Sequence, residues 1–318
     1  MNSPAPSETE LAQSVRAMYN EHPFPNYYSH LPSQSDERFR YIFTKFLHLP
    51  LEAFQGKIIF DAGCGTGENT WAWQRILGSS AEIIGLDQSE GSIRIAHGNY
   101  PEQTMRPDFV IGSLLDLGLA DNSVDAIYCS GVLVAVTEPW HAYQELVRVL
   151  KPGGYIVLIM YHRYGRALHG MRRAVVDLLE KKDINRRAQL GGKLFGRSMK
   201  KLSAQAHSPY EGVLYDQFGL PCESRYTVGQ VCKWYRKANI HYIGSWPPVE
   251  WSQFGKALRF SYHLSGQRNA PLKRLLIRIF PDMDKYSTRV PSVFSRASMQ
   301  LLWAFGQQQL FAVSGRKE

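Results

Sequence analysis

Three glycines, Gly63, Gly65 and Gly67, occupy alternate positions in the stretch IIFDAGCGTGENT, residues 58–70. Glycine reaches positive backbone φ angles at little cost and lets another group approach the main chain closely. The apolar run KIIF before the glycines is typical of a buried strand, and NTWAWQRIL after them has apolar residues at helical spacing. A strand, a glycine-rich turn and a helix in this order predict a loop that holds a ligand against its backbone.

The residue after the last glycine separates two ligand classes. A dinucleotide-binding loop has the spacing G-x-G-x-x-G, which lets a pyrophosphate rest on a helix N-terminus. Here the spacing is G-x-G-x-G, and Glu68 stands where the third dinucleotide glycine would fall. A carboxylate at that position repels a pyrophosphate but tolerates a cation that carries an amino acid tail. The loop therefore favours such a cation.

The segment DAGCGTG, with the strand before it, resembles the first motif of class I S-adenosylmethionine-dependent methyltransferases. Asp87 ends the run IIGLD 20 residues after the last glycine, where the resemblance implies hydrogen bonds from both ribose hydroxyls. GSLLDL (112–117) resembles the adenine-binding corner, with Ser113 where many relatives have an aspartate. VDAIYCSGVL (124–133) resembles the fourth strand with its loop, and ELVRVLKPGGYIVL (145–158) resembles the next helix, turn and strand.

This resemblance covers residues 57–160 and implies S-adenosylmethionine as the cofactor, with S-adenosylhomocysteine as the product. It implies no metal, and the loop after the fourth strand lacks the carboxylates that a magnesium site would need. The residues expected to contact the cofactor are Asp61, Gly63, Cys64, Gly65, Gly67, Asn69, Asp87, Gln88, Ser113, Leu114, Ser130 and Tyr27.

Strand-like and helical segments alternate from residue 57 onward, which predicts a parallel sheet built from crossover units. The predicted fold is α/β: a Rossmann-like, mostly parallel sheet of about seven strands with helices on both faces. A basic helical segment interrupts the alternation after the fifth strand and is expected to cap the strand ends. As the resemblance implies, LFAVSGRK (310–317) should insert antiparallel beside IHYIGSW (240–246). The expected domains are an N-terminal helical lid segment (1–50), a cofactor-binding core (51–161), a helical cap (162–235) and the C-terminal part of the sheet (236–318).

Two helices are predicted before the sheet begins. Ser7 and Glu10 have the spacing of a capping box, which marks the start of the first helix. Asp36 is expected to cap the second helix, in which Phe39 and Phe43 belong to an apolar stripe.

The segment YNEHPFPNYY (19–28) is similar to the Y-x-x-x-P-F-P-x-Y opening of a bacterial subset of these enzymes. Pro23 and Pro25 must end the preceding helix, because proline is excluded from a helix interior. We expect this segment, with Tyr19 and Tyr27, to lie over the cofactor as a lid that excludes water. The alternative is that its aromatic residues only pack the first helix against the sheet.

A general base is needed only if the methyl acceptor holds its proton at neutral pH. His162 directly follows the fifth strand, at the edge where open parallel sheets form their active crevice. It is the predicted base, with Tyr19 as the second predicted catalytic residue; a structural role for His162 is the alternative. The predicted acceptor-binding residues are Tyr28, Val132, Tyr164, Tyr215 and Phe218.

The composition, 44% hydrophobic and 20% charged, is that of an ordinary globular protein. The polar N-terminus predicts no signal peptide, and the longest apolar run, YIVLIMY, is too short to span a bilayer. The four cysteines lack paired spacing, so we expect a reducing, cytoplasmic location.

Residues 163–201 hold twelve Lys/Arg and three Asp/Glu and so carry the whole net charge of +9. Such a segment suits nucleic acid, an anionic membrane or an acidic substrate, or is a solvated helical face.

The predicted function is methyl transfer by in-line displacement to a small-molecule acceptor, apolar or anionic, in a lidded pocket. One alternative is a nucleic-acid methyltransferase that uses residues 163–201, and another is a non-catalytic binding protein with the same fold. The loop after the fourth strand, CSGV, lacks the prolines and aromatic residue that hold a flipped base, which disfavours nucleic acid. Contact with a membrane surface, the oligomeric state and the methylated atom are left open.

Overall fold

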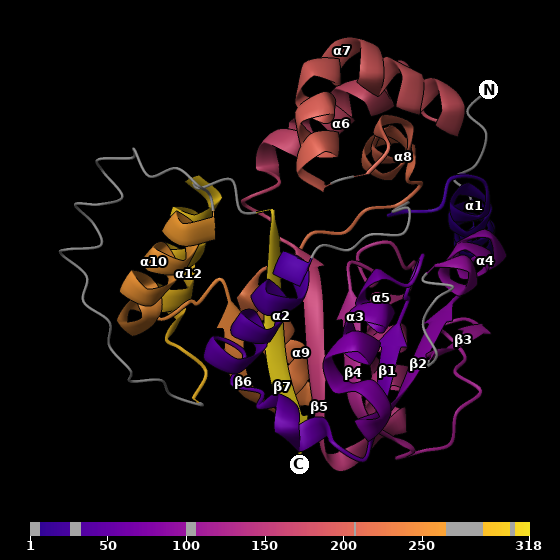
Figure 1. The fold of residues 1–318 in the computed structure, drawn as a ribbon. Helices are drawn as coiled ribbons and strands as arrows, with labels where there is room; N and C mark the ends of the chain where they lie inside the picture. Colours follow the sequence, from indigo (N-terminus) through magenta and orange to yellow (C-terminus); the bar gives the residue numbers. More distant parts are fainter. Residues whose placement is uncertain (1–6, 26–32, 100–105, 207, 265–288, 306–308) are drawn as a thin grey trace.

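The computed structural model describes residues 7–25, 33–99, 106–206, 208–264, 289–305 and 309–318. Within these residues, seven strands form one sheet in the order β3-β2-β1-β4-β5-β7-β6 (Figure 1). The strands are β1 (Lys57–Ala62), β2 (Ala81–Asp87), β3 (Asp108–Ile111), β4 (Val124–Ser130), β5 (Leu150–Tyr161), β6 (Ile240–Trp246) and β7 (Leu310–Lys317).

The direction of the strands confirms the predicted fold. Strands β1 to β5 pair with one another in parallel. Strand β7 lies antiparallel between β5 and β6, with Leu158 opposite Val313 and Ser245 opposite Val313 on the other side. The chain order reverses at β1 and β4, and ligands of such sheets bind outside the carboxyl ends of the strands at that point.

Helices surround the sheet and extend beyond its ends. Helix α1 carries the predicted capping box, because the Ser7 hydroxyl accepts from Glu10 N and the Glu10 carboxylate accepts from Ser7 N. The second helix begins at Ser33 rather than at Asp36; the Asp36 carboxylate instead accepts two hydrogen bonds from Arg75. The α-helices are α1 (Glu8–Glu21), α2 (Ser33–Lys45), α3 (Glu68–Leu77), α4 (Glu90–Gly98), α5 (Pro139–Val149), α6 (Ala167–Leu179), α7 (Ile184–Ala206), α8 (Tyr210–Leu214), α9 (Val228–Lys237), α10 (Phe254–Leu264) and α12 (Val293–Phe305).

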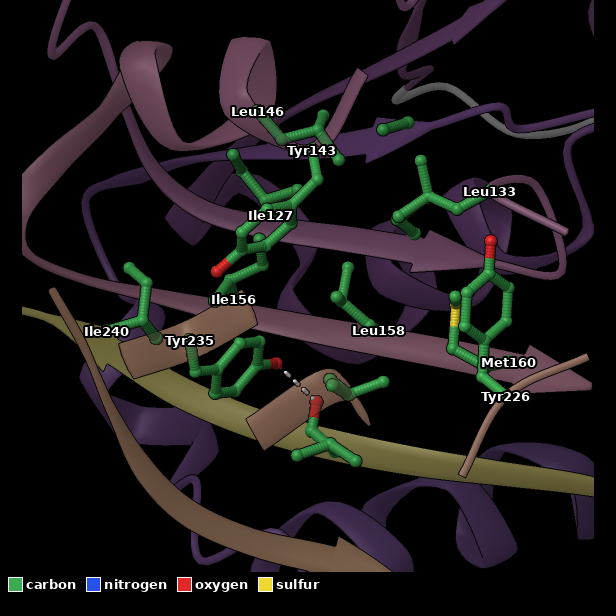
Figure 2. Packing of buried hydrophobic residues seen from close by; sticks show 14 of the residues in the cluster. Ile127, Leu133, Tyr143, Leu146, Ile156, Leu158, Met160, Tyr226, Tyr235 and Ile240 are labelled. Atoms are coloured by element: carbon green, nitrogen blue, oxygen red, sulfur yellow. Dashed lines mark hydrogen bonds between the residues drawn. The ribbon is translucent and has the colours of Figure 1, made fainter. Parts of the chain in front are cut away.

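Successive residues of each central strand point to opposite faces of the sheet, and both faces are buried. On one face Phe60 and Leu158 pack with residues of α5 and α9, such as Tyr143 and Tyr235. Figure 2 shows this cluster, in which the Tyr235 hydroxyl donates to Val313 O at 2.8 Å. On the other face the alternate strand residues pack against α2 and α3. Two apolar cores therefore hold the strands rigidly and fix the positions of their carboxyl ends.

Helices α6, α7 and α8 follow β5 and form a cap. Figure 1 shows them beyond the end of the sheet at which β5 terminates. A π-helical turn, Tyr215–Gly219, continues from α8 and carries the chain back toward the sheet. The cap has its own small core, formed by Val176, Met199, Val213 and Phe218. This confirms the predicted helical insertion after the fifth strand.

Candidate active site

The glycine loop between β1 and α3 has a backbone that side chains would obstruct. Gly63, Gly65 and Gly67 have φ angles of 78°, 55° and 84°, which are strained for other residues. A Cβ atom at Gly63 would lie 2.3 Å from the Val132 side chain, and one at Gly65 would lie 2.8 Å from Phe24 O. The alternate glycines are therefore required by both backbone conformation and close packing.

Asp87, at the end of β2, faces this loop. Its Oδ2 accepts a hydrogen bond from Gly65 N at 2.9 Å, and its Oδ1 accepts one from Ser89 N at 2.8 Å. Burial raises the pKa of Asp87, while these backbone donors oppose the rise. Each carboxylate oxygen can accept a further hydrogen bond. The two oxygens therefore suit a ligand with two adjacent hydroxyl groups, as the sequence predicted for a ribose.

Asp61, at the end of β1, is a buried acid with an incomplete set of partners. Its Oδ2 accepts from the Thr70 hydroxyl at 2.6 Å, whereas its Oδ1 has no hydrogen-bond partner among the residues that the structure describes. Burial raises its pKa to about 7, and the nearby Asp87 charge adds to the rise. A buried oxygen without a partner is costly in the absence of a ligand. A cationic ligand on the loop would offset that cost.

A cavity of about 530 Å³ extends from the glycine loop to the cap. Its volume lies within the roughly 300–1,000 Å³ typical of ligand sites. At the cap end Leu202, Val213 and Asp216 line it, and Arg166 lines it at the start of α6. The cavity wall includes these residues predicted from the sequence: Tyr19, Gly63, Cys64, Gly65, Asn69, Asp87, Gln88, Ser113, Leu114, Ser130 and Val132.

These features are those of a cofactor site at the switch point of an α/β sheet. The segment from residue 60 to residue 158 matches the family of methyltransferase domains. This part of the chain resembles a methyltransferase domain. The cofactor is S-adenosylmethionine, and the glycine loop, Asp87 and the cavity fit that cofactor.

The methyltransferase domain has relatives in several bacteria. An uncharacterized protein of Synechococcus is 30% identical over 184 residues, which are 54% of this chain and 42% of that protein. A demethylmenaquinone methyltransferase of Clavibacter sepedonicus is 37% identical over 103 residues, 32% of this chain and 40% of the relative. A solved S-adenosylmethionine-dependent methyltransferase of Mesorhizobium loti is 17% identical, with a TM-score of 0.44, over 84% of this chain and 95% of that one. The chain thus spans about two fifths of the length of the two curated relatives, at 42% and 40%.

Several other predicted residues do not line the cavity. Asp61 and Gly67 are absent from the wall, and a Cβ atom at Gly67 would meet Phe109 at 3.0 Å. Tyr215 stacks on the ring of His22 with 3.3 Å between the ring centroids, while Phe218 belongs to the cap core. Tyr164 is absent from the wall and 40% exposed, and Tyr27 and Tyr28 fall outside the described residues. Their roles in cofactor or acceptor binding stay predictions.

His162 is buried beside the methyltransferase domain and is also absent from the cavity wall. Its ring packs edge-on against Tyr164 and Phe311, with centroid distances of 5.7 and 5.9 Å. Its backbone N donates to Gln309 O at 2.8 Å, which ties the end of β5 to the start of β7. The proposed base role of His162 therefore lacks geometric support and stays a prediction.

The sequence analysis missed a polar cluster at the cap end, formed by Tyr19, Arg166, Asp216, Gln217 and Glu223. The Tyr19 hydroxyl donates to Asp216 Oδ1 at 3.4 Å, and Gln217 Nε2 donates to Asp216 Oδ2 at 2.6 Å. Arg166 donates to Gln217 Oε1 at 3.2 Å and to Glu223 Oε2 at 3.0 Å. The stretch YDQFG could have pointed to this cluster. The prediction chose its aromatic residues, Tyr215 and Phe218, whereas Asp216 and Gln217 between them line the cavity.

Burial sets the charge state of this polar cluster. It raises the pKa of Asp216, against the opposing charge of Arg166. It also raises the pKa of Tyr19 well above its ordinary value, so this hydroxyl keeps its proton at neutral pH. Burial opposes ionisation of Glu223 as well, but contacts with His169, Arg166 and Arg173 hold its pKa well below the usual range. Glu223 therefore neutralises Arg166, while Asp216 is a weaker acid than an exposed aspartate.

The end of the N-terminal segment lies directly on the glycine loop. The Thr66 hydroxyl donates to Pro25 O, and Gly91 N donates to Asn20 Oδ1 at 3.2 Å. Phe24 and Pro25 both line the cavity. The described part of this segment thus lies over the cofactor end of the site, and its action as a lid stays a prediction.

Proposed function

We propose that this chain transfers the methyl group of S-adenosylmethionine to a small molecule bound under the cap. One observation carries the proposal: a single cavity joins the glycine loop and Asp87 at one end to the polar cluster at the other. A donor and an acceptor that share one cavity are held close together, which supplies much of the rate of a displacement reaction. Relatives named demethylmenaquinone methyltransferase support a small-molecule acceptor.

When bound, the cofactor supplies a methyl group already activated by a positive sulfonium. The chain supplies position, charge and exclusion of water. Asp87 fixes the ribose, and Phe24 and Pro25 cover the loop and limit the access of solvent. Glu68, Asp87 and Asp216 place three carboxyl groups on the described wall of the cavity, and these favour a cationic ligand.

The same charges narrow the acceptor class. Arg166 contributes the one guanidinium or ammonium group on the described wall, and Glu223 neutralises it at 3.0 Å. An anionic acceptor would therefore meet acidic groups without a free cation. The cap end also presents Val136, Leu202 and Val213. Of the two predicted acceptor types, apolar and anionic, the wall supports the apolar one.

We propose Asp216 as the group that takes the acceptor's proton. Its carboxylate lines the cavity, and its raised pKa makes it a stronger base than an ordinary aspartate. Tyr19 donates to Oδ1 and orients it, which leaves the carboxylate a further lone pair for the proton of an acceptor hydroxyl or amine. His162 is the competing proposal.

The test is transfer from S-adenosylmethionine labelled with tritium in its methyl group. The protein is incubated with a small-molecule extract and, in parallel, with total nucleic acid from the same cells. Label that appears in an organic-soluble product supports the proposal. Label that appears only in nucleic acid supports the alternative based on residues 163–201, and cofactor binding without transfer to any fraction supports the non-catalytic alternative.

A further inference from the structure

Helix α6 of the cap exposes a row of large apolar side chains. Leu168, Met171, Val175, Leu178 and Leu179 are all exposed, with Met171 at 62% and Leu178 at 81%. Their spacing places them within an arc of about 100° around the helix, so they form one continuous apolar stripe. Isolated exposed leucines are common, but a continuous exposed stripe marks an interaction surface.

The opposite face of α6 is buried and carries two polar side chains beside Val176 of the cap core. His169 and Arg173 are each 6% exposed and point toward Glu223, at 3.4 Å from His169 Nε2 and 3.7 Å from Arg173 Nη1. A helix on the surface of a globular protein normally buries its apolar face and exposes its polar one. Helix α6 buries His169 and Arg173 beside Val176 and exposes its larger apolar side chains, so the apolar stripe does not serve the packing of the cap itself.

Exposed cations border this apolar stripe. Arg163 precedes α6, and Lys181 and Lys182 follow it; all three are exposed. The acids nearby are already paired: Asp177 lies 2.7 Å from Arg187, and Asp183 lies 3.5 Å from Arg186. Residues on the outer side of α7 add positive charge next to one more exposed apolar side chain: Lys193, Leu194, Arg197, Lys200 and Lys201.

The apolar stripe also lies close to the acceptor end of the cavity. Arg166, the residue directly before α6, lines that cavity, and so does Leu202 of α7. Figure 1 shows α6, α7 and α8 together beyond the strand ends, on the part of the molecule farthest from the C-terminus. A surface that contacted the apolar stripe would therefore lie against the helices that line the acceptor end of the cavity.

We propose that the apolar stripe of α6 and its flanking cations dock this protein on the surface of an anionic lipid bilayer. Leucine and methionine side chains would enter the boundary between headgroups and acyl chains, while the lysines and arginines would contact lipid phosphates. Among the described residues no helix is long and apolar enough to cross a bilayer, so the contact is peripheral. Docking does not require the proposed activity and is measured without it.

The experiment is co-sedimentation of the full chain with vesicles of phosphatidylcholine, alone or mixed with phosphatidylglycerol. We expect binding to the mixed vesicles, weakened by added salt, because surface charges are screened. Leu178→Asp should reduce binding roughly tenfold or more, since it places a charge where an apolar side chain would enter the bilayer. The double variant Lys181→Glu, Lys182→Glu should also weaken binding to the mixed vesicles, because it replaces two cations with anions.

Phe294→Asp on α12 is the matched control, because Phe294 is equally exposed, at 78%, but lies outside the cap. It should leave vesicle binding unchanged. Unchanged cofactor affinity and circular dichroism in all variants would show that they fold. Equal binding of wild type and Leu178→Asp would overturn the proposal. A dimer seen by ultracentrifugation that Leu178→Asp dissolves, without vesicle binding by the wild type, would assign the apolar stripe to a second copy of the chain instead.

Discussion

The cofactor end of the cavity is built largely from one local unit, whereas the acceptor end is assembled from distant segments. At the cofactor end, the loop from Asp61 to Asn69 and the acid Asp87 come from two adjacent strands and their turns. At the acceptor end, Tyr19 of α1 meets Asp216, 197 residues farther along the chain. A local unit leaves a readable sequence motif, while a long-range one does not. The cap end is accordingly where chemistry and specificity can differ between proteins that share one cofactor loop.

The largest expected effect lies at the acceptor end. If Asp216 takes the acceptor's proton, Asp216→Asn should lower kcat by about 10²–10⁴-fold, the usual range for loss of a general base. Calorimetry should show unchanged affinity for S-adenosylmethionine, because Asp216 lies away from the glycine loop. His162→Gln is the control and should keep most of the rate. The opposite pattern, with activity lost in His162→Gln and kept in Asp216→Asn, would assign the base to His162.

The next effect concerns the stability of the cofactor end. Burial raises the pKa of Asp61 to about 7 from 3.8, so the folded state binds this proton more tightly than the unfolded state does. The resulting stabilisation is complete below pH 3.8 and is lost as the pH rises through about 7. We expect the free energy of unfolding of the unliganded protein to fall by a few kcal/mol across this window, because each tenfold difference in proton affinity corresponds to about 1.4 kcal/mol.

Urea unfolding at several pH values measures this effect. Asp61→Asn should flatten the profile, although burial also raises the pKa of Asp87 and Asp216, so part of the slope should remain. A variant with the same pH profile as the wild type would show that Asp61 does not carry the effect.

At the cofactor end of the cavity, Asp87→Ala should weaken the binding of S-adenosylmethionine by about 1.5–3 kcal/mol, because a charged acceptor of hydrogen bonds is lost. Isothermal titration calorimetry measures this change. Glu90→Ala is the matched control, since Glu90 is a nearby acid whose side chain is 63% exposed and lies outside the cavity wall. Equal affinity of Asp87→Ala and wild type would remove Asp87 from the ribose site.

The smallest effect distinguishes a positioning residue from a catalytic one. Tyr19→Phe removes one hydrogen bond to Asp216 and should lower kcat by about two- to tenfold, corresponding to roughly 0.5–1.5 kcal/mol. The pH dependence of kcat should shift to higher pH, because the hydroxyl lowers the pKa of Asp216. A loss of rate with no shift in the pH profile would argue against orientation of Asp216 by Tyr19.

The sequence predicted the sheet, the glycine loop and most of the cofactor end because their signals are local. Alternating strand and helix patterns predict parallel crossovers, and closely spaced glycines indicate a backbone that reaches positive φ angles. Even the first helix could be placed, since the capping box of Ser7 and Glu10 lies within four residues. Asp36 shows the limit of this reasoning. Its side chain could cap a helix, but Arg75 in α3 offered two hydrogen bonds instead.

Only the tertiary structure decided which polar residues face the cavity and which are buried elsewhere. His162 and Asp216 are both polar residues near predicted elements, and the packing of Phe311 beside one and of α1 beside the other gives them different environments. The orientation of α6 was likewise hidden, because its buried face carries His169 and Arg173 beside Val176, while most of its large apolar side chains are exposed. Hydrophobic periodicity shows that a helix has two faces. Which face turns inward depends on the charged partner that folding brings to it, here Glu223.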